Sequence, residues 1–134
     1  MLLRLHLFCP LLAFAALLGA CATPPPPAQP PTGLAEVMER PAERALLEGM
    51  RAYDDGQYAL AEKSLRTALA DGLKSARDRA TAHKLLAFIT CTSERLADCQ
   101  TQFREARAAD SAFALSRSEA GHPVWGPVYK SIAQ

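Results

Sequence analysis

Two stretches of the chain carry the same pattern of side chains: YALAEKSLRTALA, residues 58–70, and LADCQTQFREARAA, residues 96–109. In both, apolar or small residues recur every three or four positions, which is the spacing of one face of an α-helix. A shift of 38 residues superposes the two patterns, and it carries Tyr58, Ala61, Leu65 and Ala68 onto Leu96, Cys99, Phe103 and Ala106. We infer that one helical unit occurs twice.

Each of these stretches is expected to be the second helix of a hairpin, which gives four helices between Pro41 and Ala109. Pro41 suits the first turn of the first helix, which should end at Asp54-Asp55-Gly56. The second helix should end near Asp71-Gly72. Ser75, with Asp78 three residues later, resembles a capping box that opens the third helix, and Thr92 and Ser93 should mark its end and the cap of the fourth.

The two hairpins, over roughly residues 42–111, resemble tetratricopeptide repeats. The usual period is about 34 residues, so GLKSARDR, residues 72–79, is expected to be a short insertion between the units. Leu73 and Ser111 replace the closing proline of the repeat, and Ala45 and His83 replace its early aromatic residue. The predicted fold is therefore all-α with two degenerate repeats, and two generic helical hairpins remain the alternative.

Small residues in this pattern should lie where paired helices approach closely. Gly49 falls on Ala87 by the same shift, just as Ala61 falls on Cys99. The large side chains Tyr58, Leu65 and Phe103 should fill the gaps around them.

The tail SRSEAGHPVWGPVYKSIAQ, residues 116–134, is expected to cover the second repeat, because stacked repeats need a neighbour to bury their outer face. Pro123, Gly126 and Pro127 exclude a long helix, although Pro127 could start a short one. Trp125 and Tyr129 then form a cap. The alternative is that these two rings are an aromatic docking surface for a partner.

The N-terminal stretch LLGACATPPPP, residues 17–27, follows a short apolar run whose only charge is Arg4. Such a run is typical of a secretory signal. Leu18-Gly19-Ala20-Cys21 resembles the lipobox of bacterial lipoproteins, which implies a signal peptide at residues 1–20 and acylation of Cys21. The alternative is an ordinary signal cut near Ala20 or Ala22, which leaves Cys21 as a thiol.

Residues 21–33 are rich in proline and should form an extended spacer that rises ~3.1 Å per residue, which places the helical domain of residues 34–134 roughly 35 Å from the lipid. Several acyl chains bind a bilayer stably where one does not. Because Ala22 follows the cysteine, where an aspartate often retains lipoproteins at the inner membrane, the resemblance implies the outer membrane, facing the periplasm.

Charge gives no indication of a nucleic-acid partner. The chain has 15 basic and 14 acidic residues, and cleavage would remove Arg4, which leaves a mature chain with 14 of each. A near-neutral chain offers no field for nucleic acid or anionic lipid. The remaining length of about a hundred residues suits one small domain.

Two cysteines remain after Cys9 leaves with the signal and Cys21 takes the lipid. Disulfides persist in an oxidising compartment, so Cys91 and Cys99 are expected to pair with each other. The alternatives are two buried thiols or a metal site, although CTSERLADC contains no histidine.

Catalytic motifs are absent from the sequence. His83 and His122 have no cysteine or carboxylate at ligand spacing, and there is neither a glycine-rich phosphate loop nor G-x-S-x-G. Acidic pairs such as Asp54-Asp55 stand at turns and helix starts, where they favour the helix dipole. We expect no enzyme activity, no cofactor and no metal.

A narrower resemblance covers nearly the whole mature chain. The segments HKLLAFITCTSERLADCQTQFREAR (83–107) and EAGHPVWGPVYKSI (119–132), together with the lipobox, the proline linker and both cysteines, are similar to small tetratricopeptide lipoproteins associated with type VI secretion (the TssQ family). This resemblance implies a non-catalytic envelope protein that accompanies a contractile secretion machine and binds an unidentified protein of that system. An assembly or pilotin-like lipoprotein of another envelope system is the alternative.

Overall fold

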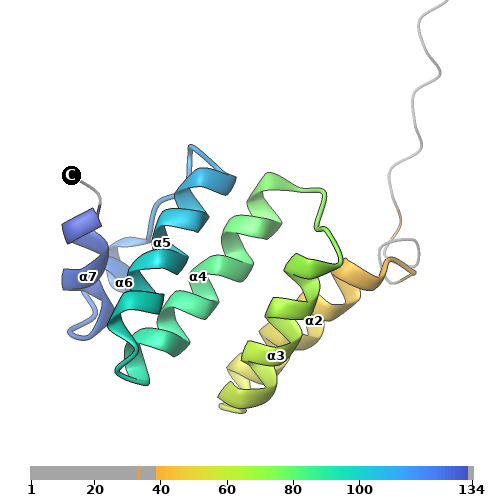
Figure 1. Ribbon diagram of the computed structural model, residues 1–134, viewed down its shortest axis with the longest axis horizontal. Coiled ribbons are helices and arrows are strands. Elements are labelled where there is room, and N and C mark those ends of the chain that lie inside the picture. The colour runs from red at the N-terminus through yellow and green to blue at the C-terminus, as the bar shows by residue number, and fades with distance from the viewer. Residues whose placement is uncertain (1–32, 34–38, 133–134) are drawn as a thin grey trace, which may run out of the picture. The chain divides into compact units, whose positions relative to one another are not determined.

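The computed structural model describes residue 33 and residues 39–132, and the helices of these residues belong to the unit Pro31–Gln134. These residues form no strand, and the predicted all-α fold class is confirmed. The helices are α2 (Pro41–Asp54), α3 (Tyr58–Ala70), α4 (Ala76–Thr92), α5 (Leu96–Ala109), α6 (Arg117–Ala120) and α7 (Trp125–Ile132). Figure 1 shows them following one another in chain order, with α6 and α7 beyond α5.

The repeated pattern forms the inner face of each hairpin. Helix α2 packs against α3, and α4 packs against α5. The last three members of each pattern are fully buried: Ala61, Leu65 and Ala68 in α3, and Cys99, Phe103 and Ala106 in α5. The first member of each pattern was predicted to be part of this face, and that prediction is wrong.

Tyr58 and Leu96 are 52% and 54% exposed. Each is the first residue of its helix, so its side chain lies at the end of the hairpin beside the turn rather than between the helices. Tyr58 keeps one edge-on ring contact, with Tyr53, at 5.6 Å between centroids.

Gly49 lies at a close approach of α2 to Leu65 of α3. A Cβ atom at this position would lie 2.8 Å from Cγ of Leu65 and 3.1 Å from its backbone nitrogen. No ordinary side chain fits there without moving α3, so glycine sets the distance between the helices. In the second hairpin, Ala87 and Phe103 stand at the corresponding positions, and both are fully buried.

The turn of the first hairpin has a glycine in the left-handed conformation. Gly56 has φ 73°. Its amide donates to the carbonyl of Tyr53 at 3.0 Å, and the amide of Gln57 donates to the carbonyl of Ala52 at 2.8 Å. This pair of bonds is the Schellman motif, which satisfies the last carbonyls of a helix.

The turn of the second hairpin repeats the same bonds with the 38-residue shift. The amide of Glu94 donates to Cys91 at 3.1 Å, and the amide of Arg95 donates to Thr90 at 2.9 Å. Glu94 takes the place of Gly56 and has φ 61°. A residue with a Cβ atom is strained in this region. The two hairpins therefore share their turn geometry, although only the first has glycine in it.

The extra residues of the longer repeat period lie at the start of α4. This helix begins at Ala76, three residues before Arg79, which is the position that corresponds to Pro41. The Ser75 hydroxyl accepts a hydrogen bond from the amide of Asp78 at 3.2 Å and caps the helix. The predicted insertion is thus an added helical turn with its connection.

Two of the predicted helix boundaries differ from the structure. Ser93 was expected to cap the fourth helix, but α5 begins after Arg95, because Ser93 and Glu94 are used by the turn. Helix α7 begins at Trp125, two residues before Pro127. A proline is tolerated there since the first amides of a helix have no acceptor within it.

Glu94→Gly should stabilise the protein by about 0.5–1 kcal/mol, because it relieves the strain of the left-handed conformation at the cost of a more flexible unfolded chain. Thermal unfolding followed by circular dichroism measures this difference. Gly56→Ala is the matched control and should destabilise by about 1 kcal/mol. A fall in melting temperature with Glu94→Gly would contradict the equivalence of the two turns.

Candidate functional site

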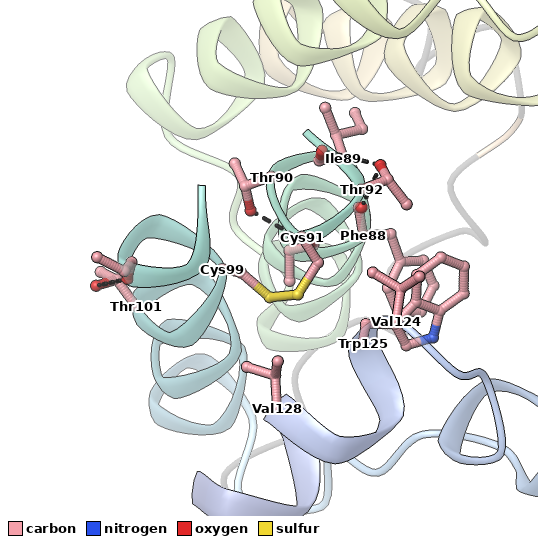
Figure 2. The surroundings of a disulfide bond; sticks show 12 residues. Phe88, Ile89, Thr90, Cys91, Thr92, Cys99, Thr101, Val124, Trp125 and Val128 are labelled. Carbon is pink, nitrogen blue, oxygen red and sulfur yellow. Dashed lines mark hydrogen bonds between the residues drawn. A yellow bond between two sulfur atoms is a disulfide. The ribbon is translucent and has the colours of Figure 1, made fainter. Parts of the chain in front are cut away.

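A disulfide closes the second hairpin. It joins Cys91 in the last turn of α4 to Cys99 near the start of α5, and their Cα atoms lie 5.1 Å apart, as a disulfide requires. Both residues are buried. Figure 2 shows the bond between the two helices, with Val128 and Trp125 of α7 close to it. Tyr53 and Ala61 take the corresponding positions in the first hairpin, so only the second is closed covalently.

Trp125 is packed between two rings of its own chain. One neighbour is Phe88 of α4, with 4.2 Å between ring centroids, and the other is His122, at 3.3 Å. The indole nitrogen donates a hydrogen bond to the carbonyl of Glu119 at 2.9 Å. The half-buried indole thus has both of its faces and its polar atom occupied.

Tyr129 attaches the other end of α7. Its ring meets Phe103 of α5 edge-on at 5.3 Å and Phe113 at 6.2 Å. Its hydroxyl accepts a hydrogen bond from the amide of Leu115 at 3.4 Å. Of the two interpretations of the aromatic tail, the contacts of Trp125 and Tyr129 with Phe88 and Phe103 favour a cap over α4 and α5, and both rings are half-buried.

The tail is also attached by a glycine contact and an ion pair. A Cβ atom at Gly126 would lie 2.5 Å from the carbonyl oxygen of Ala120, so α7 can pack on α6 only with glycine there. Glu119 of α6 pairs with Lys84 of α4 at 2.7 Å. Burial alone would raise the pKa of Glu119, but hydrogen bonds from Lys84 and Ser116 outweigh it and lower that pKa.

The two hairpins are joined by an ion pair that the sequence analysis did not anticipate. Arg95, in the turn before α5, donates to both carboxylate oxygens of Glu62 in α3, at 3.0 and 2.6 Å. Arg66 donates to the same carboxylate at 2.8 Å. The hydrogen bond from Arg95 is the largest cause that lowers the pKa of Glu62, to about 2, against the opposing effect of partial burial.

The predicted site residues fall into three groups. The helix-packing residues, which are Gly49, Ala61, Leu65, Ala87 and Phe103, are all buried between helices. Cys91, Cys99, Trp125 and Tyr129 come together around the second hairpin. Cys21, the predicted signal peptide and residues 21–32 of the predicted proline-rich spacer lie outside the described residues. Sequence reasoning missed Glu62, Arg95 and the capping box of Ser116 with Glu119, although the last was readable as S-x-x-E.

The described residues contain no group of three or more His, Cys, Asp or Glu able to hold a metal ion. Nδ1 of His83 is 2.8 Å from Oε1 of Gln102, and Nδ1 of His122 accepts from the amide of Val124 at 3.2 Å. A groove of about 450 Å³ lies between the start of α4 and the segment after α5, with Arg77, Asp110 and Phe113 among its lining residues.

Comparison of the chain with protein-family models, curated proteins and solved structures found no match. Within the part of the chain that the structure describes, no helix combines the length and the apolar character needed to cross a bilayer. A function has to be inferred from the geometry above and from the sequence motifs.

Cys99→Ala should lower the stability of the mature protein by about 2.5 kcal/mol on the chain-entropy model, and the melting temperature by about 10 °C or more. Alanine leaves little packing defect, because Ala61 fills the same position in the first hairpin. Melting curves with and without reductant measure the effect. Reductant should lower the melting temperature of the wild type to that of the variant and leave the melting temperature of the variant unchanged. A wild-type melting temperature that does not change on complete reduction would contradict a stabilising bond.

Glu62→Gln should flatten the loss of stability in acid. The folded-state pKa of Glu62 lies below its ordinary value of 4.5, so its contribution is present above pH 4.5 and lost as the pH falls towards 2. At pH 7 we expect a loss of about 1 kcal/mol, since Arg95 is 39% exposed and solvent screens the pair. Urea unfolding at several pH values measures it. Arg95→Gln should flatten the profile only in part, because Arg66 still pairs with Glu62, and fully additive losses in the double variant would argue against the pair.

Proposed function

We propose that the protein is a lipid-anchored lipoprotein of the bacterial outer membrane that faces the periplasm and binds another protein of the envelope. It acts as a non-catalytic interaction module, most simply as an accessory of a type VI secretion system. The observation that carries this proposal is the buried Cys91–Cys99 disulfide within a repeated helical hairpin, because structural disulfides belong to oxidising compartments such as the periplasm.

The lipobox-like Leu18-Gly19-Ala20-Cys21 supports the same compartment independently of the disulfide. The proline-rich segment that follows suits a spacer between lipid and domain. Helical repeats typically offer extended surfaces to other proteins.

A second candidate is an assembly or pilotin-like lipoprotein of another envelope machine, which has the same anchor and the same kind of domain. Neighbouring genes for a contractile sheath would favour the first candidate, whereas genes for a pilus or for barrel assembly would favour the second. Loss of secreted effector protein from the medium in a deletion strain, restored by the wild-type gene, would separate the two directly.

Metabolic labelling with radioactive palmitate should label the wild-type chain, and Cys21→Ala should abolish the label and leave an unprocessed or mis-cleaved precursor. Cys9→Ala is the matched control and should retain the label, because Cys9 precedes the predicted cleavage site. The labelled protein should fractionate with the outer membrane. If the wild-type chain carries no label, the proposed lipid anchor is wrong, and a soluble periplasmic protein becomes the better interpretation.

A further inference from the structure

The outer side of the first hairpin carries two adjoining grooves. Arg44, Leu47, Glu48 and Arg51 of α2 line one of about 390 Å³. The other, of about 250 Å³, lies between α2 and α3 and shares Glu48, with Leu60 and Lys63 of α3 also lining it. We call the surface formed by these six residues the end face.

The repeat shows what the corresponding surface does in the second hairpin. The 38-residue shift carries the four α2 residues of the end face onto Ala82, Leu85, Leu86 and Ile89 of α4, all of which are buried. Their spacing places them on one side of α4. Cys91, which bonds to α5, lies on the opposite side, so this side packs against the first hairpin.

The end face is therefore built in the position of a helix-binding surface. On α4 that position is occupied by α3, whereas on α2 no helix of the described residues occupies it. Leu47 and Leu60 remain 38% and 40% exposed there, two of the five exposed large apolar side chains of the described chain. Arg44, Glu48 and Arg51 stand where α4 has Ala82, Leu86 and Ile89, so the end face differs from the α4 surface in its charge.

The charge of the end face selects the occupant. Arg44, Arg51 and Lys63 have no ion-pair partner among the described residues, and Glu48 is the one acid among the six residues of the end face. A second copy docked through the same face would bring these cations against one another. An anionic bilayer would meet Glu48 and a concave rather than flat surface. A helix with acidic side chains beside an apolar stripe avoids both the repulsion between cations and the mismatch of shape, because its carboxylates face the cations and its apolar side chains fit the grooves.

We propose that the end face binds an acidic amphipathic helix of a partner protein, which lies on α2 as α3 lies on α4. Its apolar side chains contact Leu47 and Leu60, and its carboxylates pair with Arg44, Arg51 and Lys63. This inference rests on the proposed function and names the surface and the chemistry through which the partner is bound.

The test is site-specific photocrosslinking in cells with the full-length chain, with a photoreactive amino acid in place of Leu47. We expect one crosslinked protein, and mass spectrometry should place the crosslink in a segment with acidic residues at helical spacing. Arg44→Glu with Arg51→Glu should reduce the product at least about tenfold. Replacing the acidic residues of the partner segment by lysine should restore it.

Matched controls separate the end face from the rest of the surface. A probe at Thr101, on the exposed side of α5, should give none of this product. Lys74→Glu with Arg107→Glu reverses two exposed cations elsewhere and should leave the yield at Leu47 unchanged. Melting curves of the Arg44→Glu, Arg51→Glu protein should match the wild type, because both side chains are exposed.

Any of four outcomes would overturn the inference: no protein product at Leu47, a product with a second copy, a product with lipid or with residues 21–38 of the same chain, or a partner product insensitive to charge reversal. Palmitate labelling of the same strain distinguishes the two levels. If the chain is labelled but one of these outcomes is found, only the proposed role of the end face is wrong. If the chain is not labelled, the proposed lipid anchor is wrong, whatever the crosslinking shows.

Discussion

Gly49 lets α2 pack closely on α3 at Leu65, and two further helix contacts place a small residue in a similar way. A Cβ atom at Gly49 would enter the space of the Leu65 side chain. Ala87 and Phe103 take these positions in the second hairpin, and Gly126 lets α7 approach the carbonyl of Ala120. Close approach of the backbones lets so small a chain bury the last three members of each stripe completely, because its large side chains fit into gaps rather than hold the helices apart.

The aromatic residues connect the two hairpins and the tail through contacts between their rings. Of the described residues, all seven Phe, Tyr and Trp belong to one chain of ring contacts, from Tyr58 and Tyr53 through Phe88 to Trp125, and from Phe88 through Phe103 and Tyr129 to Phe113. This chain crosses from the first hairpin to the tail. Phe88 lies at its branch point and contacts rings of α2, α5 and α7. The tail is therefore part of the core of the second hairpin rather than an appendage to it.

The sequence predicted local features better than distant ones. Periodicity identified the stripes of α3 and α5, and the 38-residue shift paired them, because both follow from neighbouring residues. Tyr58 and Leu96 were misplaced, since periodicity cannot tell where along a helix its partner ends. The pairs Glu62–Arg95 and Lys84–Glu119 join residues 33 and 35 positions apart, and they depend on how the hairpins stack and how the tail packs, which no local pattern records. The strained turn at Glu94 was likewise hidden, because the residue type usual there is absent.

The burial of the disulfide gives it a kinetic property. Reduction begins with attack of a thiolate on one of the two sulfur atoms, yet Cys91 and Cys99 are almost wholly enclosed by α4, α5 and the start of α7. A reductant in solution must wait until the hairpin or the tail opens. The rate of reduction under native conditions therefore reports how often the second hairpin or the tail opens.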